Sequence, residues 1–300
     1  MTESELIRKR VEGLSLIARE KVSSFLSGNR RSLFLGHGSE FADLREYVYG
    51  DDLRHIDWRA TSKRHDKLIV RDFEVERNTN VIFLLDSSAS MLLGRKQPRI
   101  KQAVIAVASL ANAVISNKDN FGFGAFSDSV GKYFAPKGGK SHEFHIYRTL
   151  LNLVPEGKTK LGEAITKVAM SLNRRSIIIV VSDLHDNQEE MIKGFKIAKG
   201  FHHEVQVIQM TDFREYNFPN KVGKIKFIHP ESNDTVVADF TNPIVEGRYH
   251  YEMNKKIEEL NKFKRKLRGL KISVIESYTE QLIEKVLLSY FKAKQRGVPG

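Results

Sequence analysis

Two patterns of apolar residues alternate along this chain and predict its fold. Continuous runs of branched residues occur at 81–85 and 176–181, and runs of this kind are typical of buried parallel strands. Between them, apolar residues such as Ile100 and Val104 recur at helical spacing. Strands that alternate with helices predict an α/β fold, with a doubly wound and mostly parallel sheet of Rossmann type.

The same patterns predict the remaining elements and the domain division. We expect helices at 6–25, 143–153, 161–172 and 243–267, a hairpin at 121–134, strands at 205–210 and 272–275, and a closing helix capped by 277–280. The stretch 30–78 is different, because it is dense in charged and aromatic residues. We therefore assign 1–79 to an N-terminal helix and charged region, and 80–300 to the α/β domain. A small β-hairpin insertion is predicted at about 222–241.

Oxygen-bearing side chains follow two of the predicted strands. Asp86 ends the first apolar run and opens a D-x-S-x-S sequence with Ser88 and Ser90, Asp183 follows the later run, and Thr159 lies in a loop between them. Ligands bind at the carboxyl ends of the strands in open α/β sheets. Carboxylates and hydroxyls are hard donors that suit Mg²⁺ or Mn²⁺. These residues therefore predict a metal site, although each alone could also cap a helix or close a turn.

The order and spacing of these residues resemble the metal-ion-dependent adhesion site of von Willebrand factor A domains. That family has D-x-S-x-S after the first strand, a Thr in a later loop and an Asp after the fourth strand. One departure is Leu184, which follows Asp183 where the family usually has Gly. The resemblance implies a von Willebrand factor A-like fold and a metal whose last ligand is an acidic side chain of a protein partner.

A second signature lies before the first strand of the sheet. Its residues are Arg45, Tyr47, Gly50, Asp51, Asp52, Arg54, Asp57, Trp58 and Arg59. From charge alone this region is an ion-pair network or a partner surface, anchored by the only Trp. It closely resembles the signature of the prokaryotic domain of unknown function 58 family, whose members commonly occur beside MoxR-type AAA+ ATPases. The resemblance implies a bacterial adaptor that works with such an ATPase, with this signature as a candidate interface.

Composition narrows the classes of chemistry and the compartment. The chain has no cysteine, which excludes disulfides, thiolate catalysis and cysteine-based zinc or iron–sulfur sites. The acidic start at 1–5 is unlike a signal peptide. The longest mainly apolar run, 103–115, is shorter than a bilayer span. We therefore expect a cytoplasmic protein without a transmembrane segment.

Net charge raises nucleic acid as an alternative partner. Lys and Arg number 49 against 37 Asp and Glu, a formal charge of +12, and the segment 248–296 carries much of the excess. A basic face attracts nucleic acid or an acidic protein. No aromatic-interleaved RNA-binding motif or zinc finger accompanies the charge, so we expect a protein partner and keep nucleic-acid binding as the second alternative.

The predicted donor set favours binding over catalysis. Three neutral hydroxyls and two carboxylates leave a dication in need of a further anionic ligand. We therefore predict a metal-dependent protein-interaction module and no enzymatic activity. The first alternative is a metal-assisted phosphoester hydrolase, in which Asp186 or His185 would act as the base. Asp186 is also expected to cap a helix, because 186–189 matches a capping box.

Overall fold

A computed structural model of the chain describes residues 5, 9, 11–19, 41–48, 56–62, 67–73, 78–94, 97–116, 118–212, 223–232 and 234–278. Contacts divide the chain into two compact units. One comprises Met1–Asn29 and Thr79–Gly300, and the other comprises Arg30–Asn78. The N-terminal segment, helical at 11–19, therefore groups with the α/β domain, whereas the predicted division placed it with the charged region.

The first unit is built on a six-stranded sheet. Its strands are β3 (Asn80–Asp86), β4 (Asn120–Phe126), β5 (Val130–Lys137), β6 (Ser176–Ser182), β7 (Glu204–Thr211) and β10 (Ser273–Tyr278). Their order is β10-β7-β6-β3-β4-β5, and only β5 runs antiparallel to its neighbour. When the six strands are renumbered 1 to 6 in chain order and the sheet is read from β5 to β10, the order is 3-2-1-4-5-6, which is typical of doubly wound sheets. The predicted α/β class and von Willebrand factor A-like arrangement are confirmed.

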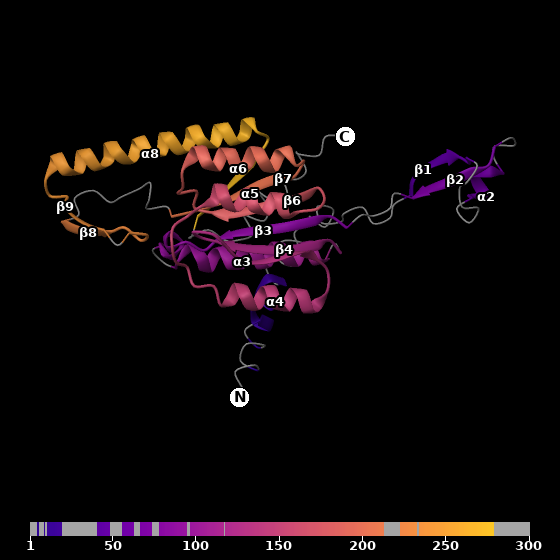
Figure 1. Ribbon diagram of the computed structural model, residues 1–300, viewed down its shortest axis with the longest axis horizontal. Helices are drawn as coiled ribbons and strands as arrows, with labels where there is room; N and C mark the ends of the chain where they lie inside the picture. Colours follow the sequence, from indigo (N-terminus) through magenta and orange to yellow (C-terminus); the bar gives the residue numbers. More distant parts are fainter. Residues whose placement is uncertain are drawn as a thin grey trace. The chain divides into compact units, whose positions relative to one another are not determined.

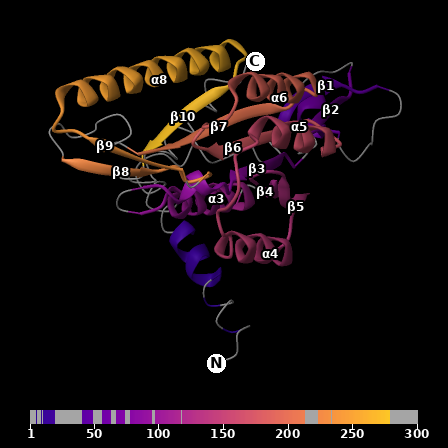
Figure 2. The ribbon, with the colours of Figure 1, turned by 60° about the vertical axis from the view of Figure 1, so that its left-hand side comes forward.

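Helices cover both faces of this sheet (Figures 1 and 2). Helices α3 (Arg99–Ser116) and α4 (Lys140–Leu151) lie on one face, and α5 (Leu161–Ser171), α6 (Gln188–Gly200) and α8 (Pro243–Gly269) on the other. Every residue of β3 and β6 is buried. Ile82 and Leu84 pack toward α5 and α6, while Phe83 contacts Phe121 edge to face at 5.7 Å. Burial on both faces explains why these strands are continuously apolar.

Helix α3 owes its apolar composition to this core. Among the described helices, it alone is long and apolar enough to cross a membrane by length and composition, and 72% of that window is buried inside the fold. Its buried side chains include Ala103, Val107 and Leu110. A core helix covered on several sides has this composition.

Helices α5 and α6 touch at two glycines. A Cβ on Gly162 would lie 2.4 Å from the carbonyl oxygen of Glu190, and one on Gly194 would lie 2.5 Å from the carbonyl oxygen of Gly162. Only glycine allows backbones to approach this closely. Helix α5 begins at Leu161, directly after the loop that carries Thr159.

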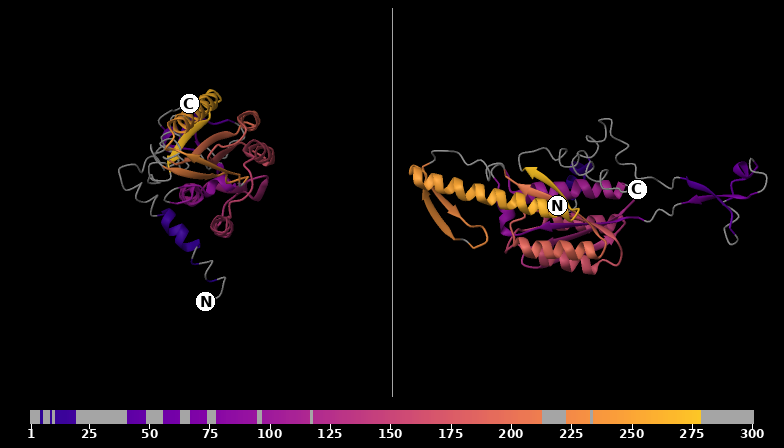
Figure 3. Two further views of the ribbon diagram at one scale, coloured as in Figure 1. Left: turned by 90° about the vertical axis from the view of Figure 1, so that its left-hand side faces the viewer. Right: turned by 90° about the horizontal axis from the view of Figure 1, so that it is seen from above.

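The predicted insertion forms a hairpin beside the long helix. Strands β8 (Lys224–Ile228) and β9 (Thr235–Asp239) pair only with each other among the described strands, and they are antiparallel. The hairpin lies near the N-terminal half of α8 (Figure 3), where Phe240 contacts Phe227 and Tyr249 at ring distances of 5.9 and 5.2 Å. A lone two-stranded hairpin is marginally stable in water, so these ring contacts support it.

The last part of the chain differs from the sequence prediction. Ser277 and Tyr278, which were expected to cap a closing helix, lie in β10 and pair with Met210 and Thr211 of β7. The prediction was wrong at these two residues because strand pairing satisfies their backbone groups. The expected closing helix itself lies outside the described residues.

Candidate functional site

The two carboxylates predicted as metal ligands meet at the carboxyl edge of the sheet. Asp86 is the last residue of β3 and Asp183 directly follows β6, and these strands are parallel neighbours with Leu85 opposite Val181. Both side chains are buried, with exposures of 0% and 1%. The hydroxyl of Ser182 donates to Oδ2 of Asp86 at 2.7 Å. The strand ends therefore bring together two residues that lie far apart in sequence.

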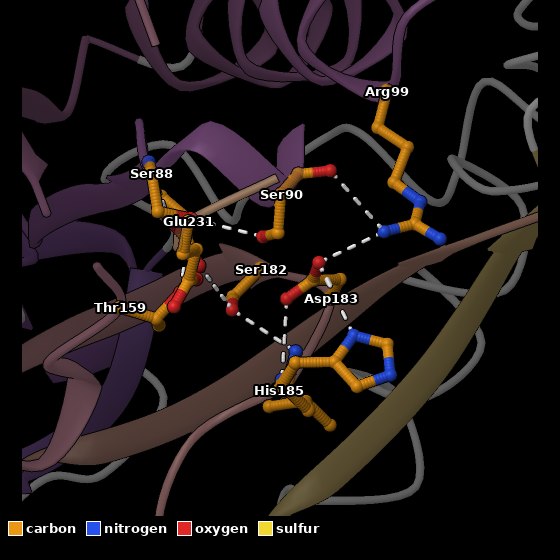
Figure 4. A network of polar contacts seen from close by, with 10 residues as sticks. Ser88, Ser90, Arg99, Thr159, Ser182, Asp183, His185 and Glu231 are labelled. Atoms are coloured by element: carbon orange, nitrogen blue, oxygen red, sulfur yellow. Dashed lines mark hydrogen bonds and ion pairs between the residues drawn. The ribbon is translucent and has the colours of Figure 1, made fainter. Parts of the chain in front are cut away.

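Three hydroxyls, those of Ser88, Ser90 and Thr159, gather beside Asp183 (Figure 4). The backbone N–H of Ser88 donates to Oδ1 of Asp86 at 2.9 Å, which shapes the turn into the short helix η3 (Ala89–Leu92). Ser88 Oγ lies 3.0 Å from Ser90 Oγ and 2.9 Å from Thr159 Oγ1. Neighbouring oxygens of an octahedral Mg²⁺ site lie about 3 Å apart, because each is about 2.1 Å from the metal. The hydroxyl spacing fits such a site.

The loop that carries Thr159 is fastened to the D-x-S-x-S turn. The N–H of Ala89 donates to the carbonyl of Gly157 at 3.1 Å, and the N–H of Lys158 donates to Oδ1 of Asp128 at 3.1 Å. Gly157 has φ +76°, and a Cβ there would lie 2.4 Å from a carboxylate oxygen of Asp128. This position therefore needs glycine. The hydroxyl of Thr159 is positioned by backbone geometry as well as by its own contacts.

A buried arginine stands beside Asp183. Arg99, in the first turn of α3, is 1% exposed, and its Nη1 donates to Asp183 Oδ2 at 2.8 Å. His185 Nδ1 lies 3.2 Å from the same oxygen. Burial alone would raise the pKa of Asp183, but the hydrogen bond and charge of His185, the Arg99 guanidinium and the Ser90 hydroxyl together hold it well below its usual range. Asp183 is therefore the ionised member of the pair.

Asp86 behaves in the opposite way. Burial and the neighbouring charge of Asp183 raise the pKa of Asp86 to about 7, against the opposing hydrogen bonds from Ser182 and Ser88. We call the group formed by Asp86, Ser88, Ser90, Thr159 and Asp183 the corner. It holds two buried carboxylates, and one buried guanidinium, that of Arg99, lies beside it. A bound cation would favour the ionised form of Asp86.

The donor set suits a hard cation held mainly by hydroxyls. No group of three His, Cys, Asp or Glu side chains suited to a metal gathers within the described residues. A metal at this corner would depend on Ser88, Ser90 and Thr159 together with Asp86 and Asp183. Such an all-oxygen set fits Mg²⁺ or Mn²⁺ better than zinc or copper. The five predicted residues are brought together, and metal binding by them stays a prediction.

Leu184 keeps the backbone shape expected of a glycine. Its φ is +62°, which lies in the left-handed region that favours glycine. Its N–H donates to the hydroxyl of Ser182 at 3.0 Å, and its side chain is 4% exposed within the apolar core. Leu184 therefore adopts a backbone conformation that glycine also adopts readily, and it adds a buried side chain.

Asp186 has a role different from the one predicted. The helix α6 is capped by Asn187, whose side chain accepts from the N–H groups of Glu189 and Glu190, so the predicted cap was wrong by one residue. Asp186 instead accepts from the N–H of Leu161 at 2.8 Å, at the start of α5. This carboxylate stabilises the turn that follows Thr159. His185, in contrast, is 59% exposed in its side chain.

One acidic residue at the site has no counterpart in the sequence prediction. The hydroxyl of Thr159 donates to Oε1 of Glu231 at 3.2 Å, and Glu231 lies in the loop of the β8–β9 hairpin. Arg99 and Ser182 were also missed. The hairpin insertion gave a weak signal for Glu231, because its turn is rich in polar residues. The burial of Arg99 has no sequence signal, since arginine at a helix start is ordinary.

The signature region belongs to the second unit. Strand β1 (Phe41–Glu46), which contains Arg45, pairs antiparallel with β2 (Ile69–Phe73), and the N–H of Tyr47 donates to the carbonyl of Leu68 at 2.8 Å. Asp57 caps the short helix α2 (Trp58–Thr61) by accepting from the N–H groups of Arg59 and Ala60 at 3.0 Å. The other predicted signature residues, Gly50, Asp51, Asp52 and Arg54, lie outside the described residues.

Trp58 does not anchor this unit, contrary to expectation. Its exposure is 67%. The first residue of a short helix has few neighbours, so its side chain stays open. An exposed Trp beside the exposed Arg59 agrees with the typical composition of interface centres, and the role of this surface stays a prediction.

Comparisons with known proteins give a family and several similar sequences. The family model described as "Protein of unknown function DUF58" matches residues 43–259. The uncharacterized protein Rv1480 of Mycobacterium tuberculosis is 27% identical over 232 residues, 76% of this chain and 71% of that protein. The uncharacterized protein YeaD of Bacillus subtilis is 32% identical over 117 residues, 38% of this chain and 26% of that protein.

Solved structures with similar folds include a conserved hypothetical protein and a VWA domain. BatB from Bacteroides thetaiotaomicron has a TM-score of 0.47 at 16% identity, over 74% of this chain and all of that chain. The SpRpn10 VWA domain has a TM-score of 0.41 at 11% identity, over 70% and 94%. The family match covers more than half of the chain, and the chain belongs to the DUF58 family, as its signature region predicted.

Proposed function

We propose that this protein is a metal-dependent protein-interaction module. It holds Mg²⁺ or Mn²⁺ through Asp86, Ser88, Ser90, Thr159 and Asp183, and it binds an acidic side chain of a protein partner. The observation that carries this proposal is the convergence of three hydroxyls and two carboxylates in one corner at the carboxyl edge of the sheet. Family membership supports a MoxR-type AAA+ ATPase as the partner.

The charges of the corner explain why an acidic partner is favoured. A dication, the two carboxylates of Asp86 and Asp183 and the guanidinium of Arg99 together leave one positive charge. When bound, the metal would supply this charge in a site of low polarity, where it attracts a carboxylate strongly. The protein residues hold the geometry: Ser182 orients Asp86, and Arg99 orients Asp183.

A titration with Mn²⁺ tests the metal step. Asp86→Asn retains an oxygen that accepts from the N–H of Ser88, so the fold should survive while the charge is lost. We expect binding to weaken at least tenfold in this variant, because a charged ligand is removed. Glu163→Gln is the matched control, since Glu163 is exposed and pairs only weakly with Lys160 at 3.2 Å. Equal Mn²⁺ affinity in wild type and Asp86→Asn would refute the metal step.

Affinity capture tests the partner step. The wild-type protein would be exposed to native lysate with Mg²⁺ or with EDTA, beside Asp86→Asn and Glu163→Gln. We expect an AAA+ ATPase to be retained only with Mg²⁺ and only by the wild type and the control. A retained set that is identical with and without metal contradicts a metal-dependent adaptor.

One observation favours the hydrolase alternative. His185 is exposed and lies beside Asp183 at 3.2 Å, so it could reach a water near the site and act as a base. Asp186 is a poorer candidate, because its carboxylate accepts from the N–H groups of Leu161 and Asn187. Turnover of a generic phosphodiester by the wild type, lost in His185→Gln, would favour this alternative.

The nucleic-acid alternative gains less support. Lys264 belongs to the basic segment, but it is buried and pairs with Glu276 at 2.6 Å. Part of the excess charge is therefore already used inside the protein. Binding to nucleic acid that weakens steeply with salt would revive this alternative.

A further inference from the structure

Local hydrogen bonds hold the hairpin tip beside the corner. The N–H of His229 donates to the carbonyl of Asp234 at 2.8 Å. The ring Nδ1 of His229 accepts from the N–H groups of Glu231 and Ser232, both at 3.3 Å, and Ser232 Oγ donates to Asp234 Oδ2. These contacts set the direction in which Glu231 leaves the turn.

Glu231 reaches the hydroxyl cluster from outside the sheet. Its Oε1 accepts from Thr159 Oγ1 at 3.2 Å, and the same Thr159 oxygen lies 2.9 Å from Ser88 Oγ (Figure 4). Thr159 itself is 6% exposed, and Glu231 contacts its hydroxyl from the hairpin loop. Figure 1 shows the hairpin at the end of the sheet where β3 finishes. A carboxylate from a distant insertion thus adjoins the proposed ligands.

The charge of Glu231 has opposite consequences with and without a cation. Without one, Glu231 adds negative charge at the Thr159 side of a corner that holds Asp86, Asp183 and the guanidinium of Arg99. Its carboxylate contacts this corner through Thr159 and does not gather with the other two carboxylates into a group of three. With a dication, the loaded corner carries one positive charge, which one carboxylate neutralises. Glu231 is placed to supply that carboxylate, and an acidic side chain from a partner would supply the same charge at the same position.

We propose that Glu231 is an intrachain ligand of this corner, which completes the loaded site and must leave before an acidic partner side chain can bind. This inference rests on the proposed function, because it requires a cation at the corner. The hairpin is suited to the exchange, since β8 and β9 pair only with each other among the described strands and can shift without breaking the main sheet. The partner therefore competes with a segment of the same chain.

Two readouts on Mn²⁺-loaded protein test the proposal. Glu231→Gln keeps the size of the side chain and removes its charge. We expect the Mn²⁺ dissociation constant to rise about tenfold and the water-proton relaxation enhancement of the bound Mn²⁺ to increase, because a water takes the vacated position. Glu163→Gln should change neither quantity. An unchanged dissociation constant and relaxation in Glu231→Gln overturn the proposal.

Acetate serves as the probe for the partner carboxylate. We expect it to lower the relaxation enhancement in Mn²⁺-loaded Glu231→Gln at concentrations that leave the wild type unaffected, because Glu231 no longer competes. Equal acetate responses in the two proteins count against the exchange. If the wild type binds no Mn²⁺, the proposed function fails together with this inference. If the wild type binds Mn²⁺ and only Glu231→Gln is without effect, this inference fails alone.

Hydrogen exchange gives an independent check on the hairpin tip. We expect Mg²⁺ to slow amide exchange at His229, Glu231 and Ser232 in the wild type and to leave it unchanged in Glu231→Gln. Slowing by the same factor in both proteins would show that the tip responds to the cation without Glu231, which contradicts the assigned role.

Discussion

The buried corner and the hairpin tip supply side chains to one site, but they hold them in different ways. Asp86, Ser88 and Asp183 are almost fully buried at the ends of central strands, and each is fastened by backbone or buried side-chain contacts. Glu231 projects from a short hairpin whose tip is held by local contacts of His229. Under the proposed function, the corner would set which ion binds, and the tip would set how accessible that ion is.

This division follows from the energetics of the two regions. Moving a strand end in the main sheet would break several backbone hydrogen bonds and expose apolar side chains, which costs many kcal/mol. Moving a surface hairpin exposes far less, and local openings of this kind cost little free energy. A protein that must bind an ion firmly and a partner reversibly can use both kinds of support.

The largest effect should come from breaking the corner at Arg99. Arg99→Met leaves the carboxylate of Asp183 buried beside Asp86 without its guanidinium. We expect the free energy of unfolding, measured in urea with EDTA, to fall by about 3–5 kcal/mol, and Mg²⁺ to restore part of it. Lys264→Met is the control, because its partner Glu276 has a side chain that is 41% exposed. Equal losses in the two variants would contradict the special role of the corner.

A smaller loss is expected at Leu184, which shapes the loop after Asp183. Leu184→Gly relieves a left-handed conformation worth about 1–2 kcal/mol but removes a buried side chain worth about 2–5 kcal/mol. The variant should therefore lose about 1–3 kcal/mol of unfolding free energy in a urea titration. Lys118→Gly, at an exposed position with φ +59°, should change it by less than about 1 kcal/mol. A gain in Leu184→Gly would mean that backbone strain dominates there.

Crowding the contact between α5 and α6 should lower the free energy of unfolding less than the two changes above. In Gly162→Ala the new Cβ meets the backbone of Glu190, and such overpacking costs about 1–3 kcal/mol, offset by about 1 kcal/mol of helix propensity. We expect a net loss of about 0–2 kcal/mol and weaker Mn²⁺ binding, since α5 follows Thr159. Gly247→Ala in α8 meets nothing within 4 Å and should gain about 0.5–1 kcal/mol. Similar thermal shifts in the two variants would argue against the close contact.

The smallest effect on stability should come from loosening the tip. His229→Ala removes the acceptor of two N–H groups while leaving the Glu231 carboxylate intact. We expect a change in unfolding free energy of less than about 0.5 kcal/mol, faster exchange of the Glu231 and Ser232 amides, and Mn²⁺ binding weakened about twofold. His145→Ala, at an exposed position on α4, is the control. A large loss of global stability in His229→Ala would show that the tip is not a local unit.

The fold was predictable because its strands carry a strong pattern. The apolar runs that became β3 and β6 are buried on both faces, and burial of this kind admits few polar residues. The glycine-like turn at Leu184 and the cap at Asn187 were less predictable. Turn conformations and caps depend on single hydrogen bonds, so neighbouring polar residues such as Asp186 and Asn187 can exchange roles.

The site was predictable in part for the same reason. Asp86 and Asp183 stand at strand ends, and parallel strands place such ends at one edge. The signature region was recognisable as a family feature, yet the exposure of Trp58 was not. Whether a large aromatic residue is buried depends on what packs over it, which a local pattern does not encode.

By itself, the sequence determined the order of strands and helices, the five oxygen-bearing side chains that we propose as ligands, and the family, because these depend on periodicity and on residues near strand ends. Only the tertiary structure decided that Arg99 is buried against Asp183 and that Glu231 reaches Thr159. Both contacts join segments dozens of residues apart through packing. Their energies arise from burial and charge at a single place in space, and no spacing along the chain specifies that place.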